Sequence, residues 1–185
     1  MTQLSLQNLI IDTLEDRKAL EKLSGYIVRG MSYPNGEYDE QIMKTLETCG
    51  IEYSRTTKST GRTFLPENFL EWHPTCHYAD ALEISKDFAK NPRRGRLLYI
   101  WGHSYELDKP EKDWDYMENI CKTLSEDKDN IWFATNIEIV DFVKAQRALK
   151  ISVDNKTVYN PSAIDVWVRN DKDIIVIKPG ETVRL

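Results

Sequence analysis

The chain has 185 residues, enough for one domain with a small addition, and its 41% hydrophobic and 30% charged residues are typical of a globular protein. The formal net charge of −5 argues against nonspecific nucleic-acid binding, which needs a basic surface. No apolar run approaches the roughly 18 residues of a membrane-spanning helix. The polar start, residues 1–9, does not resemble a signal peptide. From the charge we expect no nucleic-acid partner, and from the absence of a long apolar run we expect no membrane partner.

Cysteine usage indicates the compartment. Cys49, Cys76 and Cys121 are odd in number and far apart, so we do not expect a disulfide framework. Free thiols are typical of reducing compartments, and we therefore expect a cytoplasmic protein.

A helix opens the predicted fold. Its apolar residues recur at helical spacing, and Gly25 marks its end. Leu6, Ile10 and Leu14 step by four, and Leu20 and Leu23 follow them. A short strand is predicted next at 26–28, ending at Arg29, before a turn-rich loop over 32–36.

A second helix and a second strand follow this loop. The helix is predicted at about 38–49, with Ile42, Leu46 and Cys49 inward, and the strand at about 51–55. A long loop then carries the sequence Trp72-His73-Pro74-Thr75-Cys76-His77.

The third predicted helix, at about 79–90, stops before Pro92. The clearest strand of the chain follows at 96–101, because a continuous apolar run is typical of a strand buried on both faces. A fourth helix is expected to place one stripe inward: Trp114, Met117, Cys121 and Leu124. A strand at 131–134 and a fifth helix that opens near Asn136 complete the alternation, with Ile139 and Val143 inward.

The pattern changes after about Lys150. Short β-branched runs predict strands at 151–153, 164–168 and 174–177, and Asn170-Asp171 separates the last two as a hairpin turn would. We therefore predict an α/β domain over residues 1–150 and a small β appendage over residues 151–185, packed on that domain.

The alternation of strands and helices predicts a parallel sheet with helical cover. Four parallel strands are about half of the eight that form a (β/α) barrel of about 250 residues. The chain also opens on a helix, whereas α/β domains usually open on a strand, and both features favour a partial barrel with an N-terminal portion missing. A small open four-stranded sheet, complete in itself, explains the pattern equally well.

Polar residues that end the predicted strands are candidates for a site, because ligands of parallel α/β folds bind at the carboxyl ends of the strands. Arg29, Arg55, Gly102-His103 and Thr135-Asn136 hold such positions. His103 is the clearest of them, since histidine exchanges a proton near neutral pH and Gly102 gives the backbone room to turn. A histidine that merely caps a strand end explains the position as well.

Two of the other three positions also have plain structural explanations. Arg29 can hold a carboxylate in a bidentate pair, or it forms a surface ion pair of little energetic worth. Thr135-Asn136, with Glu138 in the following turn, is typical of a helix N-cap, and we favour the cap.

A zinc site is a further candidate. His73 and His77 have the i, i+4 spacing of a zinc-binding pair on a helix, and Cys76 and His103 would complete four ligands. Pro74 biases His73 away from helical geometry, and no standard zinc spacing matches this set. We rank a self-contained hydrolase built on this metal site last among the hypotheses.

Several segments together suggest a family. The sequence 28–36 places Arg29 before the turn Tyr33-Pro34-Asn35-Gly36, and the apolar strand 97–103 ends in His103. In order and spacing these segments resemble the third and fifth motifs of the polysaccharide deacetylase (NodB-type) family. The segments 72–77, 132–136 and 160–167 look like one subgroup of it.

The resemblance implies a distorted (β/α) barrel that hydrolyses N-acetyl groups of amino sugars with a divalent metal, often zinc, which would polarise the acetyl carbonyl and activate a water. His103 would be the general acid that protonates the departing amine, and Arg29 would orient the catalytic carboxylate. The residues that would contact the N-acetylated sugar are Tyr33, Trp72, His73, His77 and Trp101.

The sequence departs from the family in one large respect. The family's first motif supplies the catalytic Asp and a metal-binding Asp, and its second, His-x-x-x-His, supplies two more ligands; neither occurs here. Thr2-Gln3-Leu4-Ser5 looks like the stretch just after the second motif. The resemblance therefore implies the later part of the domain, with no metal held by this chain and no activity in isolation.

Two consequences follow from a partial domain. An exposed apolar edge would associate with a second copy or with an N-terminal partner chain. The alternative function is a noncatalytic protein that binds glycans or proteins through a Trp-rich rim.

Overall fold

The structure is a computed structural model that describes residues 1–91, 95–126, 129–170 and 173–185. Its contacts divide the chain into two compact units, Met1–Phe133 and Ala134–Leu185. The last helix therefore belongs to the second unit, whereas the sequence analysis placed it in the first domain. Pro92 and Asp171, which figured in the predicted helix end and hairpin turn, lie outside the described residues.

The first unit mixes helices with short strands. Its described α-helices are α1 (Leu6–Ser24), α2 (Glu40–Thr48), α3 (Ala81–Lys90) and α4 (Trp114–Ser125). Its strands are β1 (Gly30–Ser32), β2 (Tyr53–Arg55), β3 (Cys76–His77) and β4 (Ile100–Trp101). Short 3₁₀ turns lie between them: η1 (Pro34–Gly36), η2 (Phe69–Glu71), η3 (Tyr78–Asp80) and η4 (Ser104–Asp108).

Side-chain caps explain where the helices of this unit begin. Ser5, Asp39 and Asp113 each accept a backbone N–H from the first turn of α1, α2 and α4, respectively, which satisfies a donor that has no partner inside the helix. Gly25 ends α1 in the left-handed conformation, as the sequence predicted. Helices α2 and α3 lie within two residues of their predicted bounds.

The strands of the first unit run parallel. Gly30 pairs with Tyr53 and Cys76 with Ile100, so β1 lies beside β2 and β3 beside β4. A parallel bridge between Arg55 and Trp72 joins the two pairs through the segment that leads into β3. Neighbouring strands therefore follow chain order, and in the described part of the chain they form an open α/β arrangement with no closed barrel.

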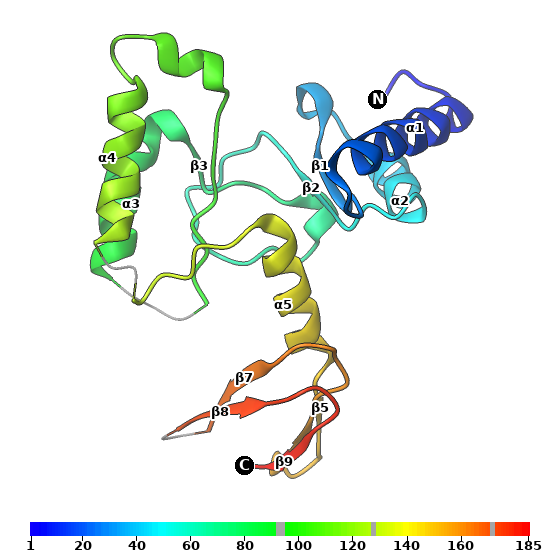
Figure 1. The fold of residues 1–185 in the computed structure, drawn as a ribbon, viewed down its shortest axis with the longest axis vertical. Coiled ribbons are helices and arrows are strands. Elements are labelled where there is room, and N and C mark those ends of the chain that lie inside the picture. Colours follow the sequence, from blue (N-terminus) through cyan, green and yellow to red (C-terminus); the bar gives the residue numbers. More distant parts are fainter. Residues whose placement is uncertain (92–94, 127–128, 171–172) are drawn as a thin grey trace. The chain divides into compact units, whose positions relative to one another are not determined.

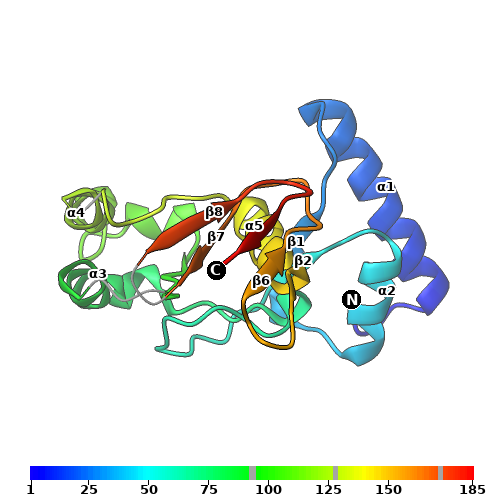
Figure 2. The same ribbon diagram turned by 90° about the horizontal axis from the view of Figure 1, so that it is seen from below.

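Two helix pairs flank these strands (Figures 1 and 2). Helices α1 and α2 pack with the residues around β1 and β2 into one buried cluster: Leu9, Tyr33, Ile42, Leu46, Ile51 and Leu70. Helices α3 and α4 pack beside β3 and β4 around a second cluster of Cys76, Ala81 and Ile120. Each pair of strands is thus held by its own buried cluster, β1 and β2 by the first and β3 and β4 by the second.

The first strand lies later in the chain than predicted. Tyr26 and Ile27 are each 69% exposed, and β1 begins only at Gly30, so the predicted strand at 26–28 is wrong. The reason is packing, because the Tyr53 ring lies directly on Gly30, where an added Cβ would come within 2.0 Å of the ring. Only glycine allows this approach, and hydrophobicity alone does not signal it.

Two other strand predictions also need correction. In the run 96–101 only Ile100–Trp101 forms a ladder, and its side chains are half-buried rather than buried on both faces. Residues 131–134 form no strand, and Trp132 and Phe133 are more than half exposed where the chain passes from one unit to the next. Instead, β3 arises from the long loop after Trp72, for which no strand was predicted.

The buried faces of two helices do not coincide with the apolar spacing in their sequences. Leu14, Leu20 and Leu23 of α1 are exposed, whereas Leu9 and Thr13 are buried. In α4, Trp114 and Cys121 are exposed, and the buried residue is Ile120. The apolar residues of helix α1 are spread around its axis instead of gathered on one face, so spacing alone could not identify its buried face.

The second unit consists of one helix and short antiparallel strands. The helix is α5 (Asn136–Ala148), and the strands are β5 (Lys150–Ile151), β6 (Thr157–Tyr159), β7 (Val166–Arg169), β8 (Ile174–Ile177) and β9 (Thr182–Arg184). Strands β7 and β8 form the predicted hairpin, and β6 lies between β5 and β9. The predicted cap on α5 is confirmed, because Thr135 and Glu138 form a capping box.

A buried asparagine organises this small unit. Asn160 is fully buried, and its side-chain amide donates to the carbonyls of Ile164 and Ile177 at 2.8 Å each. Its side-chain oxygen accepts from the backbone and the hydroxyl of Ser162. In both units, no described helix has the length and apolar character needed to cross a membrane.

Candidate functional site

The carboxyl ends of β2, β3 and β4 bring polar and aromatic side chains together. Arg55 ends β2, His77 ends β3 and Trp101 ends β4. Two further residues follow β4: His103, and Glu106 in η4. We call these five residues the strand-end cluster, and all of them lie in the first unit.

Trp101 is the centre of this cluster. The Arg55 guanidinium lies over its ring, with the guanidinium carbon 4.7 Å from the ring centroid. The His77 and His103 rings meet Trp101 edge-on at centroid distances of 5.0 and 5.8 Å. The indole N–H donates to the Ser59 hydroxyl at 3.3 Å, which fixes the orientation of the ring.

His77 and Glu106 form a hydrogen-bonded pair. His77 Nδ1 accepts from the backbone N–H of Ala79 at 3.4 Å, so neutral His77 carries its proton on Nε2. That nitrogen donates to Glu106 Oε2 at 3.0 Å. The contact with Ala79 also caps η3, so His77 has a structural role beside any chemical one.

Glu106 is held as a carboxylate. Its Oε2 accepts the backbone N–H of His103 at 2.9 Å, and this bond, together with the neighbouring His77, lowers the pKa of Glu106 below the ordinary value of 4.5. Sequence analysis missed this residue, although a glutamate three residues after His103 at the start of a helical turn is a recognisable capping pattern.

His103 lies at the exposed side of the cluster. Its ring stacks on Tyr105, with centroids 5.1 Å apart and planes 16° from parallel. Gly102 before it is required by packing, since an added Cβ would come within 2.5 Å of the Tyr78 ring. Glycine is therefore needed here for close approach rather than for the chain reversal that we expected.

His73 belongs to a neighbouring set of contacts. Its Nδ1 lies 2.6 Å from the hydroxyl oxygen of Thr56, and its Nε2 lies 3.9 Å from Glu71 Oε1. The Tyr38 hydroxyl donates to the same Glu71 oxygen at 2.7 Å. His73 thus lies one residue past the bridge between Arg55 and Trp72, near the ends of the strands.

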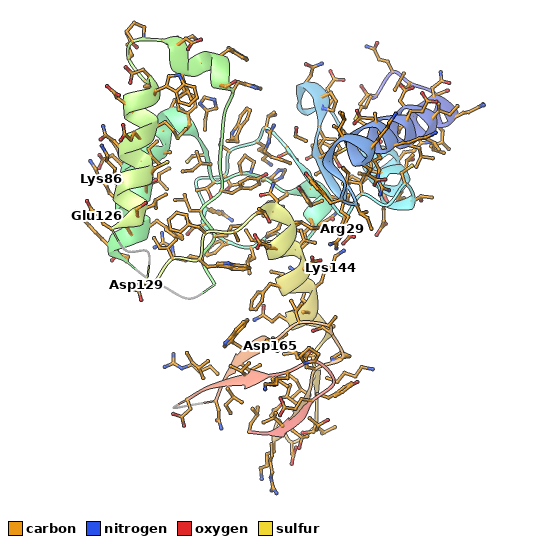
Figure 3. All side chains as sticks on the ribbon, viewed as in Figure 1. Arg29, Lys86, Glu126, Asp129, Lys144 and Asp165 are labelled. Atoms are coloured by element: carbon orange, nitrogen blue, oxygen red, sulfur yellow. The ribbon has the colours of Figure 1, made fainter. Side chains whose placement is uncertain are left out.

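Arg29 lies at the opposite end of the strands. It precedes β1, at the end of the connection from α1, and Figure 3 labels it there. Its guanidinium forms a bidentate pair with Glu52, with Nε–Oε1 at 2.5 Å and Nη2–Oε2 at 2.6 Å. Arg29 therefore lies at the start of β1, whereas His103 follows the end of β4, and its pairing with Glu52 gives no support to the predicted role of orienting a group beside His103.

Tyr33 and Trp72, which we expected to contact the sugar, are buried in the core. Tyr33 is 2% exposed, its hydroxyl donates to the Leu70 carbonyl at 2.7 Å, and burial raises its pKa to about 12. Trp72 is 1% exposed and packs against three aromatic rings: Tyr53, Phe69 and Tyr99. Neither side chain offers a ligand an accessible surface here.

The residues of the first unit do not form a site for the divalent metal that the resemblance to the polysaccharide deacetylases implies. In the described part of the chain, no three His, Cys, Asp or Glu side chains are placed to share an ion. Cys76 faces the buried cluster under α3 and α4, where burial raises its pKa to about 11. The four-ligand set His73, Cys76, His77 and His103 therefore does not assemble.

The chain was compared with models of protein families, with curated proteins and with solved structures, and none of them matches it.

Proposed function

We propose that residues 1–133 are a sector of a NodB-type (β/α) barrel that binds an N-acetylated sugar at the strand-end cluster and does not deacetylate it alone. The strand order supports the fold, since consecutive strands of a barrel lie side by side and parallel. Here β1, β2, the segment 72–77 and β4 are neighbours in chain order. Doubly wound sheets instead reverse their strand order at a switch point.

The observation that carries the proposal is the placement of the cluster. Ligands of (β/α) folds bind at the carboxyl ends of the strands, and three consecutive strands end there in Arg55, His77 and Trp101. His103 is the residue that resembles the family's general acid. Its ring contacts the Trp101 indole, which Arg55 and His77 also contact.

The chemistry of the cluster suits a sugar. Indole and imidazole rings can pack on the apolar face of a pyranose, while nearby polar groups bond its hydroxyl and acetamide groups. Trp101 and His103 supply rings, and Glu106, held beside the His77 ring, supplies a carboxylate acceptor. Since these residues bring no metal set, we expect binding without acetate release.

Calorimetric titration with N,N′,N″,N‴-tetraacetylchitotetraose tests the proposal. We expect saturable binding by the wild-type chain, about tenfold weaker binding by Trp101→Ala, and unchanged binding by Trp167→Ala, which removes a half-exposed tryptophan from the second unit. Equal loss in both variants, or no binding by the wild type, would refute it. Acetate release by the purified chain with added zinc would refute the noncatalytic part.

The partial barrel also predicts self-association. In the described part of the chain β1 pairs on one side only, and the end of α1 exposes Leu23 while the connection into β1 exposes Tyr26 and Ile27. An open strand edge beside exposed apolar side chains favours pairing with a second copy. Light scattering should give a mass above 21.6 kDa that falls in Leu23→Lys/Ile27→Lys. A monomer at all concentrations would contradict association but not sugar binding.

A further inference from the structure

We infer that Arg55 is an anion-recognition residue and that the preferred ligand is a sugar bearing a carboxylate. This inference rests on the proposed function, because it concerns the same strand-end cluster. The resemblance to the family places no role on Arg55, and the argument comes from how its guanidinium is held.

The guanidinium of Arg55 is fixed in orientation but retains hydrogen-bonding capacity. It lies over the Trp101 ring at 4.7 Å, and Nη1 donates to the Thr56 carbonyl at 3.1 Å. In the described part of the chain, no carboxylate lies within 4.0 Å of it. Stacking leaves the edge of the planar guanidinium free to present its remaining N–H groups to a ligand.

The contrast with the other half-buried arginines supports this interpretation. Arg17 pairs with Glu21, Arg29 with Glu52 and Arg96 with Asp87, as expected for arginines in a protein that has more acidic than basic residues. Arg55 is instead paired with an aromatic ring at the carboxyl end of a strand.

The nearby acidic group does not cancel this charge. Glu106 accepts from the His77 ring and from the His103 backbone, so its negative charge is already compensated within the cluster. A ligand carboxylate would therefore meet the guanidinium beside His103, whose exposed imidazole can donate a hydrogen bond. The planar, two-oxygen geometry of a carboxylate matches the N–H edge of arginine better than a hydroxyl does.

The test compares two tetrasaccharides by calorimetry. Hyaluronan tetrasaccharide alternates glucuronate with N-acetylglucosamine, whereas the same tetrasaccharide with its carboxylates reduced to alcohols has the same acetamide groups but no carboxylate. We expect the wild-type chain to bind hyaluronan tetrasaccharide about tenfold more tightly at low salt, with the advantage shrinking as salt increases. Arg55→Gln should bind the two sugars equally, and Arg55→Lys should keep only part of the preference.

Arg62→Gln is the matched control, because it removes the same charge from an exposed position in the loop after β2. It should leave the preference unchanged, and a melting curve should verify that each variant is folded. Equal affinity of the wild type for both sugars, or a preference that survives Arg55→Gln, would overturn the inference while leaving sugar binding intact. Failure of the wild type to bind either sugar would refute the proposed function itself.

Discussion

The parallel strands of the first unit have an arginine at each end, and the two arginines are held differently. Arg29, before β1, is joined to Glu52 by a bidentate ion pair. Arg55, at the end of β2, stacks on Trp101 among histidines. The first arrangement satisfies its own charges and contributes to stability. The second leaves donors and ring faces for a ligand, which is why we assign function to one end and structure to the other.

The core between the two ends should be the most sensitive to substitution. Trp72→Ala would leave a cavity among Tyr53, Phe69 and Tyr99, and we expect it to lower the free energy of unfolding by about 3–5 kcal/mol. Urea denaturation followed by circular dichroism measures this loss. Tyr26→Ala, at an exposed position, should change stability by less than about 0.5 kcal/mol. Similar losses in both variants would contradict the packing described here.

The ion pair at the structural end should affect stability alone. Arg29→Met leaves the Glu52 carboxylate, which is only 27% exposed, without its partner, and we expect a loss of about 1–3 kcal/mol in urea denaturation. The double variant Arg29→Met/Glu52→Met should recover part of the loss. Sugar affinity should not change in either protein. If folded Arg29→Met bound the sugar more weakly than the wild type, Arg29 would have to be assigned to the binding site.

Two glycines under aromatic rings offer a matched pair for the two ends. Gly30 lies under Tyr53 at the start of β1, and Gly102 lies under Tyr78 beside the cluster. Alanine at either position should cost about 1–3 kcal/mol by overpacking. Only Gly102→Ala should also weaken chitotetraose binding, because it displaces the backbone that leads to His103. Equal effects of the two variants on affinity would remove the distinction between the ends.

The smallest effect concerns pH. The folded-state pKa of Glu106 is lowered, so its contribution to stability is present above the ordinary pKa of 4.5 and is lost as pH falls through the folded value. Glu106→Gln should therefore lose less stability than the wild type as pH is lowered from 5 through this range. Thermal melts at a series of pH values measure the difference. Parallel curves for the two proteins would show that Glu106 is not held as described.

The helices of this chain could be predicted from sequence because their signals are local. The cap residues Ser5, Asp39 and Thr135 and the terminal Gly25 mark helix ends through contacts within one turn. The β7–β8 hairpin was also predictable, because its strands are close in sequence.

The strands of the first unit were harder to predict because their partners are distant in sequence. The start of β1 depends on the ring of Tyr53, and β3 depends on the backbone of β4. A shift of four residues in β1 moved Arg29 from one end of the strand to the other, and this reversed its expected role.

Part of the site was also predictable, because the ends of buried strands can be located in the sequence. His77, Trp101 and His103 could be proposed from sequence, and the structure brings them together around one ring. The spacing of Glu106 from His103 marks their local contact in the sequence, but nothing local indicates that its carboxylate also meets His77, which lies 29 residues away.

Titration of the ¹⁵N-labelled chain with tetraacetylchitotetraose tests sugar binding at the strand-end cluster residue by residue. Each of the five tryptophans gives one indole N–H resonance, which single substitutions assign. We predict that the Trp101 resonance shifts saturably, while those of Trp114 and Trp167 stay in place. Shifts confined to the other tryptophans, or none at saturating sugar, would contradict the assignment of the site.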